Sequence, residues 1–121
     1  MRHNSNIKSM KLYNFVDRVY NELKELGKND SEPLQVNELT SFDQLHYQGT
    51  KALDYAINKI GINSNMTILE IGSGIGGPAR YIANETGVTV VALELQTDQN
   101  KVALDLTERC GLSKKVRHIC G

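Results

Sequence analysis

Residues 70–78 read Glu-Ile-Gly-Ser-Gly-Ile-Gly-Gly-Pro and carry the clearest chemical pattern in the sequence. Glycines at this density let a backbone turn tightly and approach a ligand closely, and a helix that follows offers free N–H groups. The sequence holds ten glycines in 121 residues, so chance predicts this spacing of four glycines only roughly 0.005 times. We therefore expect a ligand-binding loop formed by Gly72, Ser73, Gly74, Gly76 and Gly77.

Two carboxylates accompany this loop. Glu70 stands two residues before the first glycine, and Glu94 follows a second apolar run further along the chain. In nucleotide sites on parallel sheets, a carboxylate at the end of the second strand accepts hydrogen bonds from both ribose hydroxyls. This spacing predicts that Glu94 binds a ribose, unless it is only an exposed residue at the end of a strand.

The same glycines also satisfy Gly-x-Gly-x-x-Gly, the pattern of proteins that bind nicotinamide or flavin dinucleotides. Glu70 would place a negative charge near the pyrophosphate of such a ligand, and Pro78 removes a backbone N–H that the phosphates would use. S-adenosylmethionine has a sulfonium, an ammonium and no phosphate, so it fits both residues. An NAD(P)-binding oxidoreductase domain remains the alternative.

The strands and helices that we expect on either side of the loop indicate where it lies in the fold. After residue 66, short β-branched runs alternate with helical patterns, which is typical of parallel strands joined by right-handed crossovers. The expected elements are a buried strand at 67–71, a helix at 78–86, a strand at 88–93, a helix that opens at Thr97 and ends by Gly111, and a strand at 116–120. The predicted fold class is α/β, a β-α-β-α-β half of a doubly wound, Rossmann-like parallel sheet. Because its first strand would lie at an open edge, we expect a truncated chain.

Helical patterns fill the region before the first strand. We expect one amphipathic helix at residues 10–26, a second at 42–47 opened by a capping box of Ser41 and Gln44, and a third capped by Thr50 and ended by Gly61. Residues 1–65 are therefore predicted to form an N-terminal helical lid region, and residues 66–121 a partial cofactor-binding domain.

The segment from Thr67 to Glu94 resembles the cofactor half of class I S-adenosylmethionine-dependent methyltransferases. Their first strand and loop read acid-x-Gly-x-Gly-x-Gly, and a second acid ends the second strand. Residues 74–83, with residues 42–47 upstream, are similar to the branch that includes sarcosine, dimethylglycine, quinone and tocopherol methyltransferases. The resemblance implies transfer of a methyl group from S-adenosylmethionine to a small-molecule acceptor. It also implies that Glu70 faces the cofactor amine, Glu94 holds the ribose and Leu95 lies beside the adenine.

The resemblance covers about half of a typical member of that family. The strands that carry most of the substrate site come later in the family, so no catalytic residue is carried over to this chain. Whether the 121 residues catalyse a reaction by themselves stays open. A truncated product without catalytic activity is a third hypothesis.

Composition narrows the classes of partner. The 14 basic and 14 acidic side chains cancel, which argues against nucleic acid and anionic membranes. The longest apolar run, residues 88–93, is far too short to span a bilayer, and residues 1–16 lack the apolar core of a signal peptide. We therefore predict a cytoplasmic protein with a small-molecule substrate, and the sequence does not indicate an oligomeric state.

Other polar side chains give weaker signals. The two cysteines, Cys110 and Cys120, are not spaced as metal ligands, and neither His3 nor His118 has a cysteine or carboxylate at ligand spacing. No metal site is expected. Four residues of the upstream helical segment either contact a ligand or pack in the fold, namely Asp43, Gln44, His46 and Tyr47.

Overall fold

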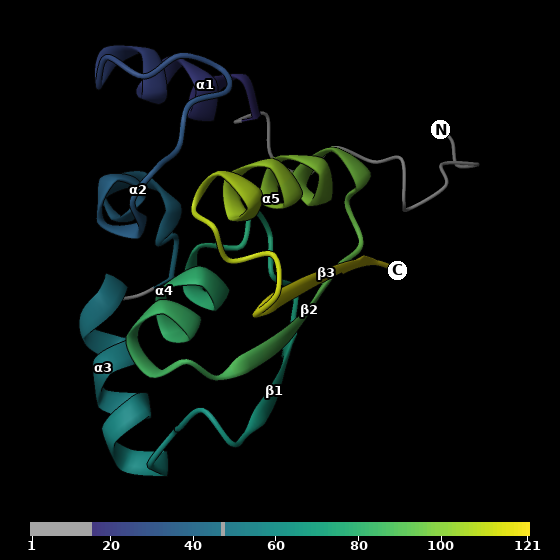
Figure 1. Cartoon of the computed structure of the whole chain (residues 1–121). Helices are drawn as coiled ribbons and strands as arrows, with labels where there is room; N and C mark the ends of the chain where they lie inside the picture. The colour runs from purple at the N-terminus through teal and green to yellow at the C-terminus, as the bar shows by residue number, and fades with distance from the viewer. Residues whose placement is uncertain (1–15, 47) are drawn as a thin grey trace, which may run out of the picture.

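A computed structural model describes residues 16–46 and 48–121 of the chain. Within these ranges, helices precede a region in which strands and helices alternate (Figure 1). The elements are α1 (Val16–Glu25), α2 (Val36–Asp43), α3 (Gly49–Ile60), β1 (Thr67–Ile71), α4 (Gly77–Thr86), β2 (Thr89–Glu94), α5 (Thr97–Arg109) and β3 (Val116–Cys120). The predicted β-α-β-α-β order is confirmed.

The strands form a parallel sheet in the order β1-β2-β3. Thr67 pairs with Thr89 at the start of β1, and Glu94 pairs with Cys120 at the end of β2. All strands therefore end at the same edge of the sheet, which is where ligands bind in open α/β folds. The loop after β1 and the residue that ends β2 lie at this edge.

Local sequence signals define α4. Pro78 lies in its first turn, where a missing N–H costs nothing. Gly87 ends the helix in the left-handed conformation and donates its N–H to the Ala83 carbonyl at 2.8 Å. The predicted end of the helix is confirmed, and its start lies one residue earlier than predicted, at Gly77, directly after the glycine-rich loop.

Two apolar clusters hold the layers together. In the first, Leu23 of α1 and Leu39 of α2 pack with Leu106 of α5. In the second, Ala83 of α4 packs with Val90 of β2 and other residues of the sheet. Figure 1 shows α2 and α3 beside α4, and α1 beside α5. The N-terminal helices thus share a core with the helices that follow the loop, and the division at residue 65 stays a prediction.

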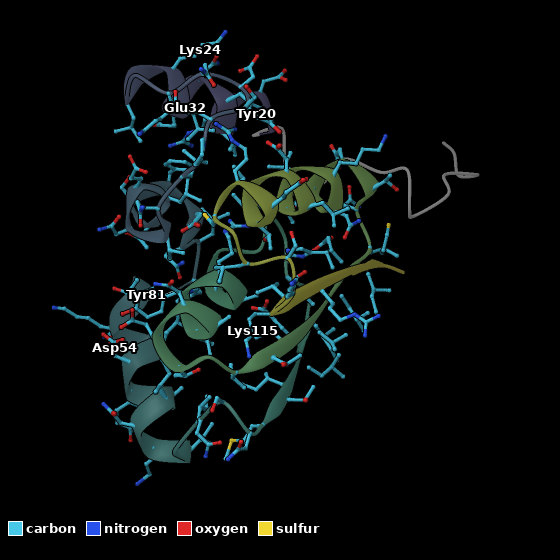
Figure 2. The ribbon with its side chains drawn as sticks, viewed as in Figure 1. Tyr20, Lys24, Glu32, Asp54, Tyr81 and Lys115 are labelled. Atoms are coloured by element: carbon cyan, nitrogen blue, oxygen red, sulfur yellow. The ribbon has the colours of Figure 1, made fainter. Side chains whose placement is uncertain are left out.

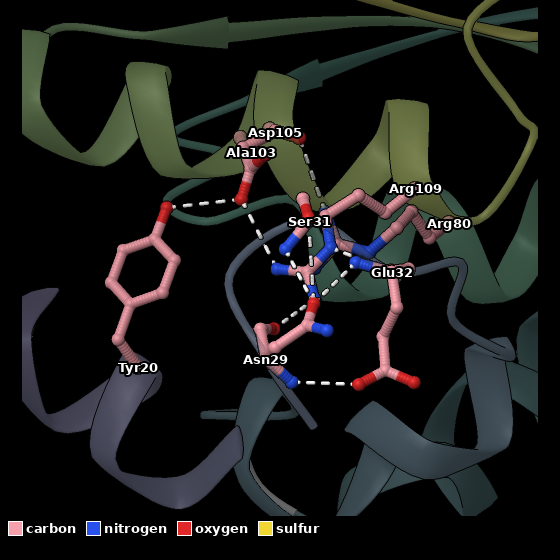
Figure 3. A network of polar contacts seen from close by, with 8 residues as sticks. All are labelled: Tyr20, Asn29, Ser31, Glu32, Arg80, Ala103, Asp105 and Arg109. Atoms are coloured by element: carbon pink, nitrogen blue, oxygen red, sulfur yellow. Dashed lines mark hydrogen bonds and ion pairs between the residues drawn. The ribbon is translucent and has the colours of Figure 1, made fainter. Parts of the chain in front are cut away.

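Polar contacts tie the connection between α1 and α2 to α5 (Figure 3). Arg109 of α5 donates hydrogen bonds to the carbonyl oxygens of Asn29 at 2.6 Å and Glu32 at 2.9 Å. Tyr20 of α1 donates to Asp105 of α5 at 3.1 Å. The predicted loop at residues 27–33 is therefore confirmed, and α5 holds it in place.

The prediction that β1 is a buried strand is wrong. Leu69 is 58% exposed and Ile71 is 79% exposed. Because α4 and α5 pack on one face of the sheet, alternate residues of β1 face away from them. Among the described residues, β1 pairs only with β2, so the predicted open edge at the first strand is confirmed.

The prediction of a second helix at residues 42–47 is also wrong beyond its first two residues, because the observed helix ends at Asp43 and residues 44–46 are not helical. Helix α2 spans Val36–Asp43 and opens with a capping box in which the Gln35 N–H donates to Glu38 at 2.8 Å. Ser41 lies in its last turn and does not cap it. The helix starts early because Leu39 is fully buried against α1 and α5.

The first and third helices differ in smaller ways from the prediction. Residues 10–15 of the expected first helix, and Tyr47, lie outside the described residues. Helix α3 starts at Gly49 after Gln48, so Thr50 lies inside its first turn rather than capping it. Gly61 ends this helix as predicted.

Candidate functional site

The glycine-rich loop connects β1 to α4 through backbone conformations that only glycine adopts easily. Gly72, Gly74 and Gly76 have φ angles of 74°, 57° and 85°. The N–H groups of Gly72 and Ser73 both donate to the Leu93 carbonyl at 2.9 Å. The loop is therefore bound to β2, and the backbone requires glycine at positions 72, 74 and 76.

Glu94 holds the other side of the loop. Its Oε1 accepts the Gly74 N–H at 2.7 Å, and its Oε2 accepts the Gln96 N–H at 2.8 Å. The residue is only 8% exposed, so it is not the exposed strand-end residue of the alternative interpretation. Each carboxylate oxygen can accept a further hydrogen bond, because each has two lone pairs.

A cavity of about 620 Å³ lies between this loop and the N-terminal helices. Its size is ordinary for a site that binds a small molecule. Five of the predicted binding residues line it: Glu70, Gly72, Ser73, Gly74 and Glu94. The opposite wall comes from the end of α2, the connection after it and α3, through Asp43, Leu45, His46 and Leu53.

The remaining predicted binding residues do not line this cavity. A Cβ on Gly77 would lie 1.9 Å from the Asp43 carbonyl oxygen, and a Cβ on Gly76 would lie 2.7 Å from the His118 ring. These two glycines therefore allow close packing inside the protein. The Leu95 carbonyl accepts a long contact from the Cys120 thiol at 3.8 Å.

Glu70 is the most perturbed carboxylate of the site. Burial raises its pKa to about 7, with Arg80 lowering it and Glu94 raising it. Its Oε1 makes no hydrogen bond with the described residues, and neither does the Ser73 hydroxyl, which is 5% exposed. The cavity wall thus presents one carboxylate oxygen and one hydroxyl that a ligand can satisfy.

A buried ion pair lies behind the loop, and the sequence did not reveal it. Arg80 Nη2 lies 3.1 Å from Asp43 Oδ2, and both side chains are almost fully buried. Burial raises the pKa of Asp43, and its contact with Arg80 opposes that rise. Arg80 also donates to Thr107 at 3.2 Å and to the Ala103 carbonyl at 3.5 Å, the latter drawn in Figure 3. One guanidinium therefore joins α2, α4 and α5.

A signal for Arg80 was present in the sequence. Arg80 follows Ala79 and precedes Ala83 by three residues, which places it on the apolar face of α4. An arginine at such a position needs a buried acceptor. The periodicity therefore indicates that Arg80 is buried, but it does not identify Asp43 as its partner.

The histidines have different surroundings. His46 lines the cavity, and its Nε2 lies 2.9 Å from Gln44 Oε1. His118 bonds Thr107 at 2.7 Å, and burial followed by the charge of Arg80 lowers its pKa to about 4, so it is neutral. Residues 16–46 and 48–121 contain no cluster of side chains that could hold a metal ion. No helix in these ranges is long and apolar enough to cross a membrane.

Curated proteins resemble about half of this chain. Methyltransferase phqN of Penicillium fellutanum is 35% identical over 65 residues, which is 54% of this chain and 20% of that protein. Sterol 24-C-methyltransferase erg6 of Aspergillus fumigatus is 39% identical over 67 residues, 55% of this chain and 18% of that protein. The matched segment thus spans about a fifth of each relative.

Solved structures share the fold. An RNA methyltransferase of Salinibacter ruber, crystallised with S-adenosyl-L-homocysteine, superposes with a TM-score of 0.58 at 20% identity, over 63% of this chain and 50% of that one. A Galdieria sulphuraria protein, which its name proposes to be a sarcosine dimethylglycine methyltransferase, gives a TM-score of 0.58 at 21% identity. That match covers 88% of this chain and 41% of the other.

One family model matches most of the chain. The family model described as mycolic acid cyclopropane synthetase matches residues 10–120. This range includes the glycine-rich loop, Glu70 and Glu94, and the helices that form the opposite wall of the cavity. The chain therefore belongs to the mycolic acid cyclopropane synthetase family of S-adenosylmethionine-dependent methyltransferases.

Proposed function

We propose that the cavity beside the glycine-rich loop binds S-adenosylmethionine, as the cofactor-binding part of a methyltransferase that acts on a small molecule. The observation that carries this proposal is the set of polar groups in one cavity wall. Glu70 Oε1 and the Ser73 hydroxyl are buried there without a hydrogen-bond partner among the described residues, and Glu94 is anchored beside them.

These groups fit the chemical parts of this cofactor. Glu70 would face the ammonium group, because an unpaired buried carboxylate favours a cation. Glu94 would accept the ribose hydroxyls with the lone pairs that its two backbone hydrogen bonds leave over. The Ser73 hydroxyl would donate to the carboxylate of the cofactor's methionine part, since the N–H groups of residues 72–74 already donate to Leu93 and Glu94. When bound, this cofactor supplies a methyl group on a sulfonium, which is already activated for transfer.

The protein would mainly align the reactants and exclude water. The segment before α3, with Leu45 and His46, would cover the cofactor in the manner of a lid. No residue of this chain is proposed as a catalytic acid or base. The methyl acceptor is proposed to be a small molecule because the curated relatives include sterol methyltransferases.

The other assignments of partner and place are proposals as well. The equal numbers of acidic and basic residues support an acceptor other than nucleic acid, although one structural neighbour is named an RNA methyltransferase. A cytoplasmic location is proposed because Cys110 and Cys120 are free thiols, which suits a reducing compartment.

Thermal unfolding and calorimetry with S-adenosylhomocysteine test the cofactor site. At a ligand concentration of 100 times Kd, binding stabilises the folded chain by about 2.7 kcal/mol and raises Tm by about 10 °C. Glu94→Gln should remove most of this shift, whereas Glu108→Gln on the exposed side of α5 should leave it unchanged. A Tm that responds to NADH and not to S-adenosylhomocysteine would replace this proposal with the oxidoreductase alternative.

A further inference from the structure

A chain of hydrogen bonds runs from the buried guanidinium of Arg80 to the wall of the cavity. Arg80 Nη2 bonds Asp43 Oδ2 at 3.1 Å, and the other oxygen, Asp43 Oδ1, accepts the Gln44 amide N–H at 3.0 Å. The Gln44 amide oxygen in turn lies 2.9 Å from His46 Nε2. His46 and Asp43 both line the cavity.

The direction of these bonds follows from their chemistry. The ionised Asp43 carboxylate only accepts hydrogen bonds, so the Gln44 amide must turn its nitrogen toward Asp43. Its oxygen then faces His46, which must donate from Nε2. The ion pair therefore determines both the orientation of Gln44 and the ring nitrogen of His46 that carries the proton.

The backbone of Gly77 also packs closely against Asp43. Gly77 opens α4 directly after the loop, and a Cβ there would lie 1.9 Å from the Asp43 carbonyl oxygen and 2.9 Å from its carboxyl carbon. The end of α2 therefore lies against the first turn of α4, with no room for a side chain between them. Gly77 has no positive φ, so close packing rather than backbone strain requires glycine here.

We propose that the Asp43–Arg80 ion pair positions the wall segment, residues 44–46, against the glycine-rich loop and so sets the shape of the ligand cavity. Arg80 is suited to this role because it is fully buried and also bonded to α5. A displaced Asp43 would move Gln44 and His46 together. This inference rests on the proposed function of the cavity as a cofactor site.

Three variants test the proposal at different points. Asp43→Asn keeps the shape of the side chain but removes the negative charge that faces Arg80. Gly77→Ala leaves every charge in place and pushes the end of α2 away from α4, while alanine favours the helix itself. Gln44→Ala interrupts the chain between Asp43 and His46 and leaves the ion pair intact, so it serves if Asp43→Asn does not fold.

Tyr81→Phe is the matched control. Tyr81 donates to Asp54 at 2.6 Å, and Figure 2 shows the two side chains turned toward each other between α4 and α3. This bond also joins α4 to an N-terminal helix, but it lies on the exposed surface and outside the cavity. Its loss should change neither readout described below.

The first readout is the Kd of S-adenosylhomocysteine, measured by calorimetry on the full chain. The second is the rate at which diethylpyrocarbonate modifies each histidine, followed by mass spectrometry without ligand. We expect Asp43→Asn, Gly77→Ala and Gln44→Ala to raise Kd about fivefold or more and to speed the modification of His46 by a similar factor. General loosening is followed by the far-UV circular dichroism of each variant without ligand, which should match that of the original chain. His118 is not suited to this control, because Thr107 bonds both His118 and Arg80.

The outcomes separate this inference from the proposed function. Unchanged His46 rates in all three variants, or faster modification only together with a loss of helical signal, would overturn the positioning role. If the original chain does not bind S-adenosylhomocysteine, the proposed function fails. The modification rates still decide whether the ion pair positions His46.

Discussion

Replacing Glu70 with glutamine should stabilise the free chain and weaken its binding of S-adenosylhomocysteine. Burial raises the pKa of Glu70 from 4.5 to about 7, and the charges that act on it are those of Arg80 and Glu94. The folded chain therefore holds this proton more tightly than the unfolded chain, and ionising Glu70 costs stability. A glutamine has the same shape and cannot ionise, so the variant avoids this cost.

The stability cost of ionising Glu70, and the pH at which it appears, follow from the raised pKa of this residue. The cost is absent well below pH 4.5, grows as the pH rises toward 7, and reaches about 3 kcal/mol near pH 8. For a domain of this length, the variant should melt about 10 °C higher than the original chain at pH 8 and less than about 2 °C higher at pH 4.5. Loss of a charged hydrogen bond to the ligand ammonium should raise Kd about tenfold or more.

Thermal melts at both pH values and calorimetry at pH 8 measure these quantities. Glu108→Gln, on the exposed side of α5, is the control and should change neither Tm nor Kd. A Glu70→Gln variant that is no more stable than the original chain at pH 8 would refute the argument that burial perturbs Glu70. An unchanged Kd would show that Glu70 does not face the ligand amine.

Glu94→Gln leaves one of two backbone N–H groups without an acceptor and should lower the free energy of unfolding in urea by about 2 kcal/mol; an unchanged midpoint would contradict its anchoring role. Gly76→Ala should cost about 2 kcal/mol more than Gly111→Ala in thermal melts, because both have positive φ but only the first Cβ would meet His118. Leu69→Lys, on the exposed face of β1, should change stability by less than about 0.5 kcal/mol and reduce light scattering; a large loss of stability would mean that this face is covered.

Elements with strong local signals were predictable from sequence. Pro78 and Gly87 bound α4, and the β-branched run at β3 (Val116–Cys120) matches the prediction residue for residue. These signals act through the backbone of the residue itself or its close neighbours, so they do not depend on the rest of the fold. The burial of β1 was not predictable in this way, because it depends on which faces and edges of the sheet other elements cover.

The start of α2, in contrast, was not predictable from local signals. Ser41 is a better helix cap than Gln35 by intrinsic preference, yet α2 begins after Gln35. Burial of Leu39 between α1 and α5 outweighs the capping preference, since a fully buried leucine contributes more free energy than one cap. The start of this helix was therefore decided by tertiary packing.

The candidate site also combines features that the sequence predicts with features that depend on tertiary packing. The glycine-rich loop and the two carboxylates at the ends of β1 and β2 could be predicted from the amino acids, because parallel strands bring their carboxyl ends to one edge. The contact of Arg80 with Asp43, 37 residues apart, and the close packing of Gly77 on Asp43 became visible in the folded chain alone. Pairings of this kind depend on how α2 packs against α4, and neither local propensity nor spacing along the chain contains that information.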